Sequence, residues 1–219
     1  QAGGIGTRGI GETNTELMKR HWKREIKRVT DAIAHLTDNR RRQIENRKSM
    51  GLQTISLVGY TNAGKTSLFN ILTHKKNLVE NTLFATLDSA VGKIYIPQLA
   101  RTIVVSDTIG FIKDLPPELI EAFTSTLLES INAEVVLHVV DLSDPDMFEK
   151  IDVVDKILKD LGIPEEKVIL VFNKIDAVPS LDKQKIIERV APSPYIFLSA
   201  KTHEGVDTLL ATILPRLKR

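Results

Sequence analysis

The chain has 219 residues, 42% of them hydrophobic, and a formal net charge of +2, so it is long enough to bury a core. No run approaches the ~18 apolar residues that a membrane-spanning helix needs, and no signal peptide is present, which argues against a membrane protein. The chain contains no cysteine, as is common in a reducing compartment.

The charge is unevenly distributed along the chain. Residues 1–51 carry 12 Lys/Arg and 6 Asp/Glu, a net charge of +6, whereas residues 52–219 carry 18 and 22, a net charge of −4. We therefore expect a basic front segment, residues 1–50, joined to a mildly acidic domain, residues 51–219. The first residue is Gln rather than Met, and we interpret the chain as a fragment of a longer protein.

The front segment opens with GGIGTRGIGET (3–13), a composition typical of a flexible connector. From about Thr15 to Lys48 the pattern becomes helical, with apolar residues separated by 4, 4, 3, 4 and 3 positions. This apolar seam consists of Met18, Trp22, Ile26, Val29, Ile33 and Leu36. It needs an apolar partner, either a helix outside this chain or the domain that follows.

Basic residues surround the seam: Lys19, Arg20, Lys23, Arg24, Lys27, Arg28, Arg40, Arg41 and Arg42. Such a face can contact the phosphate backbone of a nucleic acid. The alternative is an ordinary solvated helix face.

Residues 59–66, GYTNAGKT, have the G-x-x-x-x-G-K-[ST] spacing of a phosphate-binding loop. The loop lies between a predicted strand (54–59) and a predicted helix (66–73), which is the required context. Its two glycines allow the backbone to approach a ligand closely, and its amides can form an anion-binding nest. Lys65 would reach the β- and γ-phosphates and Thr66 would bind Mg²⁺. A plain glycine-rich turn is the alternative.

The remaining sequence alternates strands and helices. Strands are expected at 91–97, 101–107, 134–141, 167–176 and 195–201, and helices at 116–131, 146–161, 182–190 and 205–217. The fold class is therefore α/β, with a mostly parallel six-stranded sheet and helices on both faces. Ligands of such sheets bind at the carboxyl ends of strands, where Gly59, Asp107, Asn173 and Ser199 fall.

Two of these strand ends carry specific chemistry. Asp107 in DTIG can hold Mg²⁺ through water, and Gly110 offers an N–H to a γ-phosphate. In NKID, the Asp176 carboxylate can accept two hydrogen bonds from a guanine edge, which adenine cannot offer. Asn173 would brace the loops, and the aliphatic stem of Lys174 would lie along the base. Ala200 in SAK offers an N–H to the guanine O6, whereas His138 in its apolar strand is interpreted as a core residue.

The strings GYTNAGKT, FATLD, DTIGF, NKID and SAKT, in this order, resemble the five motifs of a translation-factor-class GTPase. Together with GGIGTRGIGET and the basic helix, they resemble the HflX family of the Obg–HflX superfamily, over nearly the whole chain. The resemblance implies a P-loop GTPase fold, GTP or GDP as ligand with Mg²⁺, association with the large ribosomal subunit and its RNA, and a cytoplasmic location without membrane contact. It also implies an N-terminal domain that this chain lacks, and we expect a monomer. The family usually has Pro where Ile10 stands.

The resemblance also implies the site residues. Mg²⁺ would be held by Thr66 and the switch threonine Thr86, with Asp107 acting through water. The catalytic residues would be Lys65, Asn62 and Gly110. The expected nucleotide contacts are Gly59, Tyr60, Thr61, Asn62, Ala63, Gly64, Lys65, Thr66, Ser67, Phe84, Ala85, Thr86, Leu87, Asp88, Asp107, Thr108, Ile109, Gly110, Asn173, Lys174, Asp176, Ser199, Ala200 and Lys201.

Two residues leave the mechanism open. Many related GTPases place a Gln after the DTIG glycine to orient the attacking water, but here Phe111 stands there and cannot hydrogen-bond a water. Two interpretations therefore remain: a GTP-hydrolysing switch, or a nucleotide-gated RNA- or ribosome-binding module whose hydrolysis is incidental. A P-loop kinase or ATPase is disfavoured by NKID. Asn62 resembles the asparagine with which some GTPases bind K⁺, but it can instead serve a positive φ or cap the loop.

Overall fold

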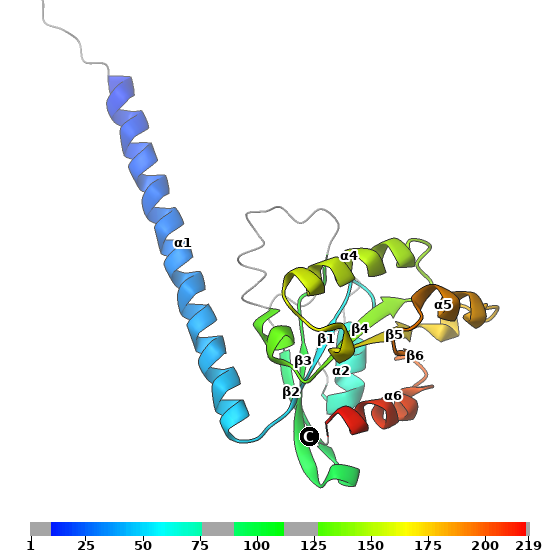
Figure 1. Cartoon of the computed structure of the whole chain (residues 1–219). Helices are drawn as coiled ribbons and strands as arrows, with labels where there is room; N and C mark the ends of the chain where they lie inside the picture. Colours follow the sequence, from blue (N-terminus) through cyan, green and yellow to red (C-terminus); the bar gives the residue numbers. More distant parts are fainter. Residues whose placement is uncertain (1–9, 76–89, 112–126, 218–219) are drawn as a thin grey trace, which may run out of the picture.

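The computed structural model describes residues 10–75, 90–111 and 127–217. At its centre is a six-stranded sheet with the strand order β2-β3-β1-β4-β5-β6 (Figure 1). The strands are β1 (Thr54–Val58), β2 (Ala90–Ile96), β3 (Arg101–Asp107), β4 (Val135–Asp141), β5 (Val168–Asn173) and β6 (Tyr195–Phe197). The hairpin pair β2 and β3 is antiparallel and all other neighbours are parallel, which confirms the predicted sheet.

Helices cover both faces of this sheet. They are α2 (Lys65–Thr73), α4 (Met147–Asp160), α5 (Lys183–Val190) and α6 (Val206–Ile213), and residues 127–132 are also helical. Side chains of α2 and α6 share one buried cluster with the sheet, and those of α4, α5 and 127–132 form two clusters on the other face. Consecutive residues of β1 illustrate the alternation, since Leu57 belongs to the first cluster and Val58 to the opposite one.

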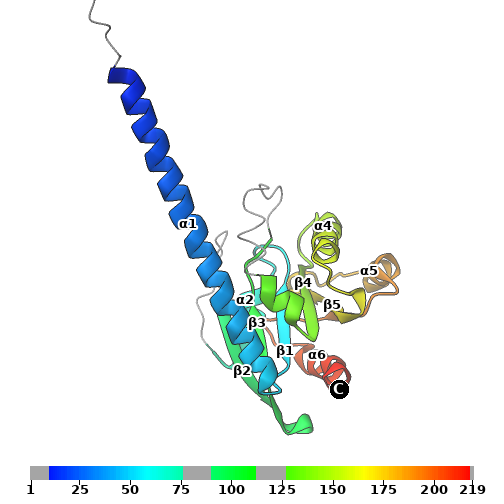
Figure 2. The same ribbon diagram turned by 60° about the vertical axis from the view of Figure 1, so that its left-hand side comes forward.

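The front segment forms one helix, α1 (Ile10–Ser49), whose 40 residues correspond to about 60 Å. It runs away from the sheet domain, and among the residues that the structure describes only its carboxyl end meets the domain (Figures 1 and 2). There Ile44 is buried, Arg47 Nη2 donates to both carboxylate oxygens of Glu129 (2.5 and 2.7 Å), and Lys48 donates to Asn132 Oδ1 (2.7 Å). The seam does not pack on the domain, because Met18, Trp22, Ile26, Val29 and Leu36 are 56–64% exposed.

Three elements end three or four residues earlier than the sequence predicts. β5 stops at Asn173 because Lys174 adopts a left-handed conformation (φ 67°) and a 3₁₀ turn, Ile175–Ala177, follows. β6 stops at Phe197, since Ser199 turns the chain by bonding the amides of Lys201 and Thr202. α6 gives way to a 3₁₀ turn that contains a proline, Leu214–Arg216. Two further 3₁₀ turns span Pro97–Leu99 and Glu165–Lys167. The expected helix 116–131 lies mostly outside the described residues.

Candidate nucleotide-binding site

The phosphate loop (59–66) joins β1 to α2 and depends on backbone conformations that most residues avoid. Gly59 has φ 141°, and a Cβ there would lie 2.2 Å from a carbonyl oxygen of β4. Gly64 has φ 92°, and a Cβ there would lie 2.2 Å from Asn173 Nδ2. Asn62 also has a positive φ, 64°, a conformation that asparagine tolerates better than most residues. The spacing of the motif therefore reflects a tightly wound loop pressed against two other strands.

Lys65 occupies the interior of this loop. It is the first residue of α2 and only 6% exposed, and its Nζ donates to the carbonyl oxygens of Gly59 (3.1 Å) and Tyr60 (2.8 Å). Burial lowers the pKa of Lys65 to about 8, although the charge of Asp107 acts in the opposite direction. The loop thus holds a desolvated ammonium group, which favours the arrival of an anion.

Thr66 and Asp107 meet at the side of the loop. Thr66 Oγ1 donates to Asp107 Oδ2 over 2.7 Å, and Asp107 is fully buried at the end of β3. A hydroxyl and a carboxylate are hard oxygen donors, and Mg²⁺ prefers such ligands with water completing its shell. The donor set therefore fits Mg²⁺, as the sequence suggested. Thr86, the other expected ligand, lies outside the described residues.

The DTIG segment lies directly against the phosphate loop. A Cβ on Gly110 would be 2.8 Å from Thr61 Cα and 2.9 Å from Lys65 Nζ. The next residue, Phe111, donates its N–H to the Gly59 carbonyl (3.0 Å) and accepts the Thr61 N–H (2.9 Å). Gly110 is therefore beside the ammonium group of Lys65, and any side chain at this position would collide with the loop.

Phe111 points into the core rather than toward the loop opening. It is 1% exposed and belongs to the cluster that contains Val58, Leu127 and Val136. Its burial adds a geometric reason to the chemical one, because neither the type nor the direction of this side chain suits the orientation of a water molecule.

Asn173 joins three segments that are far apart in the sequence. Its Nδ2 donates to the Ala63 carbonyl of the phosphate loop (2.9 Å), and its Oδ1 accepts the Ala200 N–H (2.9 Å). The side chain is 2% exposed, and its bond to the Ala63 carbonyl is buried. Asn173 therefore braces the loops, as predicted.

Asp176 is held by the segment after β6. Ser199 Oγ donates to Asp176 Oδ1 (2.6 Å) and accepts the N–H groups of Lys201 (3.1 Å) and Thr202 (3.0 Å). One carboxylate oxygen is thereby held in place by a buried serine. The expected base-binding residues of NKID and SAK thus form one bonded unit.

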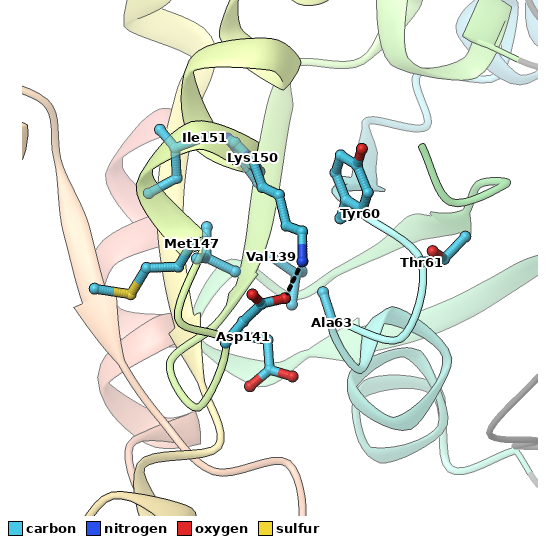
Figure 3. A pocket seen from close by; sticks show the side chains of 11 residues that line it. Tyr60, Thr61, Ala63, Val139, Asp141, Met147, Lys150 and Ile151 are labelled. Atoms are coloured by element: carbon cyan, nitrogen blue, oxygen red, sulfur yellow. Dashed lines mark hydrogen bonds and ion pairs between the residues drawn. The ribbon is translucent and has the colours of Figure 1, made fainter. Parts of the chain in front are cut away.

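Sequence reasoning missed one member of this region. Lys174 Nζ donates to Asp141 Oδ2 (2.6 Å) at the end of β4, beside a pocket that is also lined by Tyr60, Asp144 and Lys150 (Figure 3). The signal was present, because Asp141 ends an apolar strand in the same way as Asp107.

The structure brings most of the expected site residues together at the carboxyl edge of β1, β3 and β5. Thr108 fixes the DTIG turn by donating its hydroxyl to the Leu57 carbonyl (2.7 Å), and Ile109 is buried. Ser67 lies in the first turn of α2. The five FATLD residues, Phe84, Ala85, Thr86, Leu87 and Asp88, lie outside the described residues.

Comparison with known proteins agrees with this geometry. A family model described as "50S ribosome-binding GTPase" matches residues 54–174. The GTPase HflX of Caldanaerobacter subterraneus is 44% identical over 96% of this chain and 47% of its own length. The GTPase HflX of Escherichia coli K12 is 36% identical over 99% of the chain and 51% of its own length. The chain thus spans about half the length of these curated relatives, and the similarity to the HflX family is confirmed.

Solved structures show the same fold. A GTP-binding protein from Sulfolobus solfataricus in complex with GDP has a TM-score of 0.65 and 26% identity, covering 95% of this chain and 61% of that one. NFeoB from S. thermophilus, bound to GDP.AlF4⁻ and K⁺, has a TM-score of 0.59 and 25% identity, covering 74% and 60%. These likenesses confirm the P-loop GTPase fold.

Proposed function

The chain belongs to the family of 50S ribosome-binding GTPases, and from this premise we propose that it binds GTP with Mg²⁺ and hydrolyses it to GDP and phosphate. The observation that carries the proposal is the pair of hydrogen bonds made by the Asn173 side chain, which connects the phosphate loop to the segment proposed to recognise guanine. The proposed phosphate-binding and base-binding groups thus lie on one edge of the sheet and are connected by these two hydrogen bonds.

Each residue then has a definite task. The loop amides and the Lys65 ammonium bind the β- and γ-phosphates, and the Gly110 N–H binds the γ-phosphate. Thr66, with Thr86 and with Asp107 through water, holds Mg²⁺, which when bound offsets the charge of the phosphate oxygens. Asp176 accepts the guanine N1–H and exocyclic amine, and Ala200 donates to its O6. Most of the catalysis is then positioning and electrostatic stabilisation.

Asn62 is proposed to help stabilise charge between the β- and γ-phosphates. Its side chain is exposed on the loop, and its carbonyl oxygen can serve as a ligand to K⁺. The NFeoB structure with GDP.AlF4⁻ and K⁺ supports a monovalent cation in a G domain of this kind. The positive φ of Asn62 equally supports the alternative that this residue only shapes the loop. A hydrolysis rate that depends on the monovalent cation distinguishes K⁺ binding from this alternative.

We further propose that the protein acts in the cytoplasm with the large ribosomal subunit, as a monomer in which residues 1–50 form a basic arm on the G domain (51–219). The family description and the exposed basic residues of α1 support this partner. Among the described residues, no helix is long and apolar enough to cross a membrane.

A second function is favoured by one observation, the burial of Phe111. With no water-orienting side chain after Gly110, the protein would serve as a nucleotide-gated ribosome-binding module, and its hydrolysis would be incidental.

GTP turnover with and without large ribosomal subunits tests these proposals. For a switch GTPase we expect a rate on the order of 10⁻⁴ s⁻¹ alone, rising at least about tenfold with subunits. A rate unaffected by subunits that nevertheless bind in the GTP state would support the module instead. Equal binding of ATP and GTP would contradict guanine recognition.

The ribosomal partner has its own test in α1. The double charge reversal Arg41→Glu/Arg42→Glu should weaken subunit binding and reduce the slope of log K against log[salt], because fewer phosphates are neutralised. Lys156→Glu/Lys159→Glu, on the exposed side of α4, is the matched control. An unchanged slope in the α1 variant would mean that this basic face does not contact RNA and is an ordinary solvated helix face.

A further inference from the structure

The carboxylate of Asp141 is held at both oxygens. Its Oδ1 accepts the N–H (2.9 Å) and the hydroxyl (2.6 Å) of Ser143, and its Oδ2 accepts Lys174 Nζ (2.6 Å). The backbones are tied as well, because the Leu142 N–H donates to the Asn173 carbonyl (3.0 Å) and Asp141 pairs with Asn173 in the sheet. Asp141 is therefore a fixed anchor rather than a surface carboxylate that meets a lysine by chance.

Lys174 combines an unusual backbone conformation with a long, partly exposed side chain. Its φ of 67° and ψ of 35° are left-handed, which is uncommon for residues other than glycine. Its side chain is long, rich in rotamers and 30% exposed, so nothing in its own segment keeps the stem in one direction. The ion pair with Asp141, itself 14% exposed, supplies that direction.

The neighbouring charges leave Asp141 to Lys174. Asp144 is the other carboxylate of this pocket, and its direct partner is Lys150, which also lies 5.3 Å from the centre of the Tyr60 ring (Figure 3). Each lysine thus has its own direct carboxylate partner, although the charge of Lys174 also acts on Asp144.

We propose that Asp141 is a positioning residue for nucleotide binding, which acts by holding the Lys174 ammonium so that the lysine stem lies flat along the guanine nucleoside. This inference rests on the proposed function and deepens it, since it assigns a role to a residue outside the five motifs. Because the contact is with the nucleoside, it serves GDP and GTP alike and has no part in the hydrolysis step.

The test uses the dissociation rate of a fluorescent GDP. Asp141→Asn keeps the shape of the side chain but removes the charge that holds Lys174, and dissociation should become about tenfold faster. Lys174→Met keeps an apolar stem without the ammonium and should have a similar effect. The double variant should dissociate no faster than Lys174→Met, because Asp141 acts only through the ammonium. The KM for GTP should rise while kcat stays unchanged.

Asp152→Asn is the matched control, because it removes an exposed ion pair with Arg189 (3.2 Å) away from the site. Additive effects of Asp141→Asn and Lys174→Met, or a wild-type rate in Asp141→Asn, would overturn the inference. A wild-type protein that binds no guanine nucleotide would instead overturn the proposed function. If Asp141→Asn folds poorly, a wild-type rate in Lys174→Met would still overturn the inference, because Asp141 would then have nothing to position.

Discussion

The two halves of the candidate site are built in different ways. The phosphate half owes its shape to the backbone: Gly59, Asn62 and Gly64 have positive φ angles, and Lys65 bonds the carbonyls of its own loop. The base half is built from side chains that connect distant segments, as Asn173 does with Ala63, 110 positions away. The phosphate loop takes most of its form from its own backbone, although Asn173 and Phe111 also bond to it, whereas the side-chain network of the base half fixes form and function together. A substitution in the phosphate half should therefore lower nucleotide affinity alone, whereas one that breaks the network of the base half should lower both affinity and stability.

The largest effect is expected from Asp176→Asn in the base half. An amide at this position cannot accept both guanine hydrogen bonds, so the preference for GTP over XTP should reverse, within the 10⁴–10⁵-fold range of such polar sites. Competition of GTP and XTP against a fluorescent nucleotide measures the change. A variant that still prefers GTP would place guanine recognition elsewhere.

The next effect is expected from Lys65→Met in the phosphate half. Loss of a desolvated ammonium should lower the affinity for both GTP and GDP by about 10²–10³-fold, the value of two charge-assisted hydrogen bonds. The free protein should remain as stable as the wild type, because burial of this charge opposes folding. Titration and thermal unfolding of the variant, with the exposed Lys75→Met as control, give both quantities. A large loss of unfolding free energy in Lys65→Met would contradict the proposed difference between the two halves.

Asn173→Ala, unlike Lys65→Met, should lower the stability of the free protein. This variant leaves a loop carbonyl and the Ala200 amide without their partner, so it should lose about 2 kcal/mol of unfolding free energy together with affinity. Denaturant unfolding without nucleotide is the measurement, and Gln184→Ala, which removes an exposed amide, is the control. If Asn173→Ala lost affinity but no stability, the base half would be no more integrated than the phosphate half.

The same difference explains what the sequence could predict. The glycine spacing and the strand-end residues Asp107 and Asn173 follow from rules of local geometry, and so do the six strands and the long front helix. The position of Asp141 at a strand end was visible in the sequence, but its partner Lys174 is apparent only when β4 and β5 are side by side. The burial of Phe111 and the early end of β6 depend on tertiary packing and on the hydrogen bonds of Ser199, which no periodicity reports.

The exposed seam of α1 is the other part that the sequence left open. Two partners were expected for it, a helix outside this chain or the sheet domain. The sheet domain does not cover the seam, because five of the six apolar residues of the seam are more than half exposed. In the described part of the chain, α1 is attached to the domain at its carboxyl end, where Arg47 bonds Glu129 and Lys48 bonds Asn132.

The smallest effect is expected at Asn62, and it tests whether the phosphate half is shaped by its backbone alone. If Asn62 only adopts its positive φ, then Asn62→Gly, which accepts that conformation freely, should hydrolyse GTP as the wild type does in both KCl and NaCl. If its carbonyl oxygen binds K⁺ against the phosphates, the wild type should turn over about threefold faster in KCl than in NaCl at equal ionic strength, a barrier change below 1 kcal/mol. Asn62→Gly should then keep the NaCl rate and lose the acceleration. Single-turnover GTP hydrolysis in the two salts measures both rates. Equal wild-type rates in the two salts would mean that Asn62 only supports the backbone conformation of the loop. If Asn62→Gly lost only the acceleration by KCl, the phosphate half would contain a second functional side chain besides Lys65.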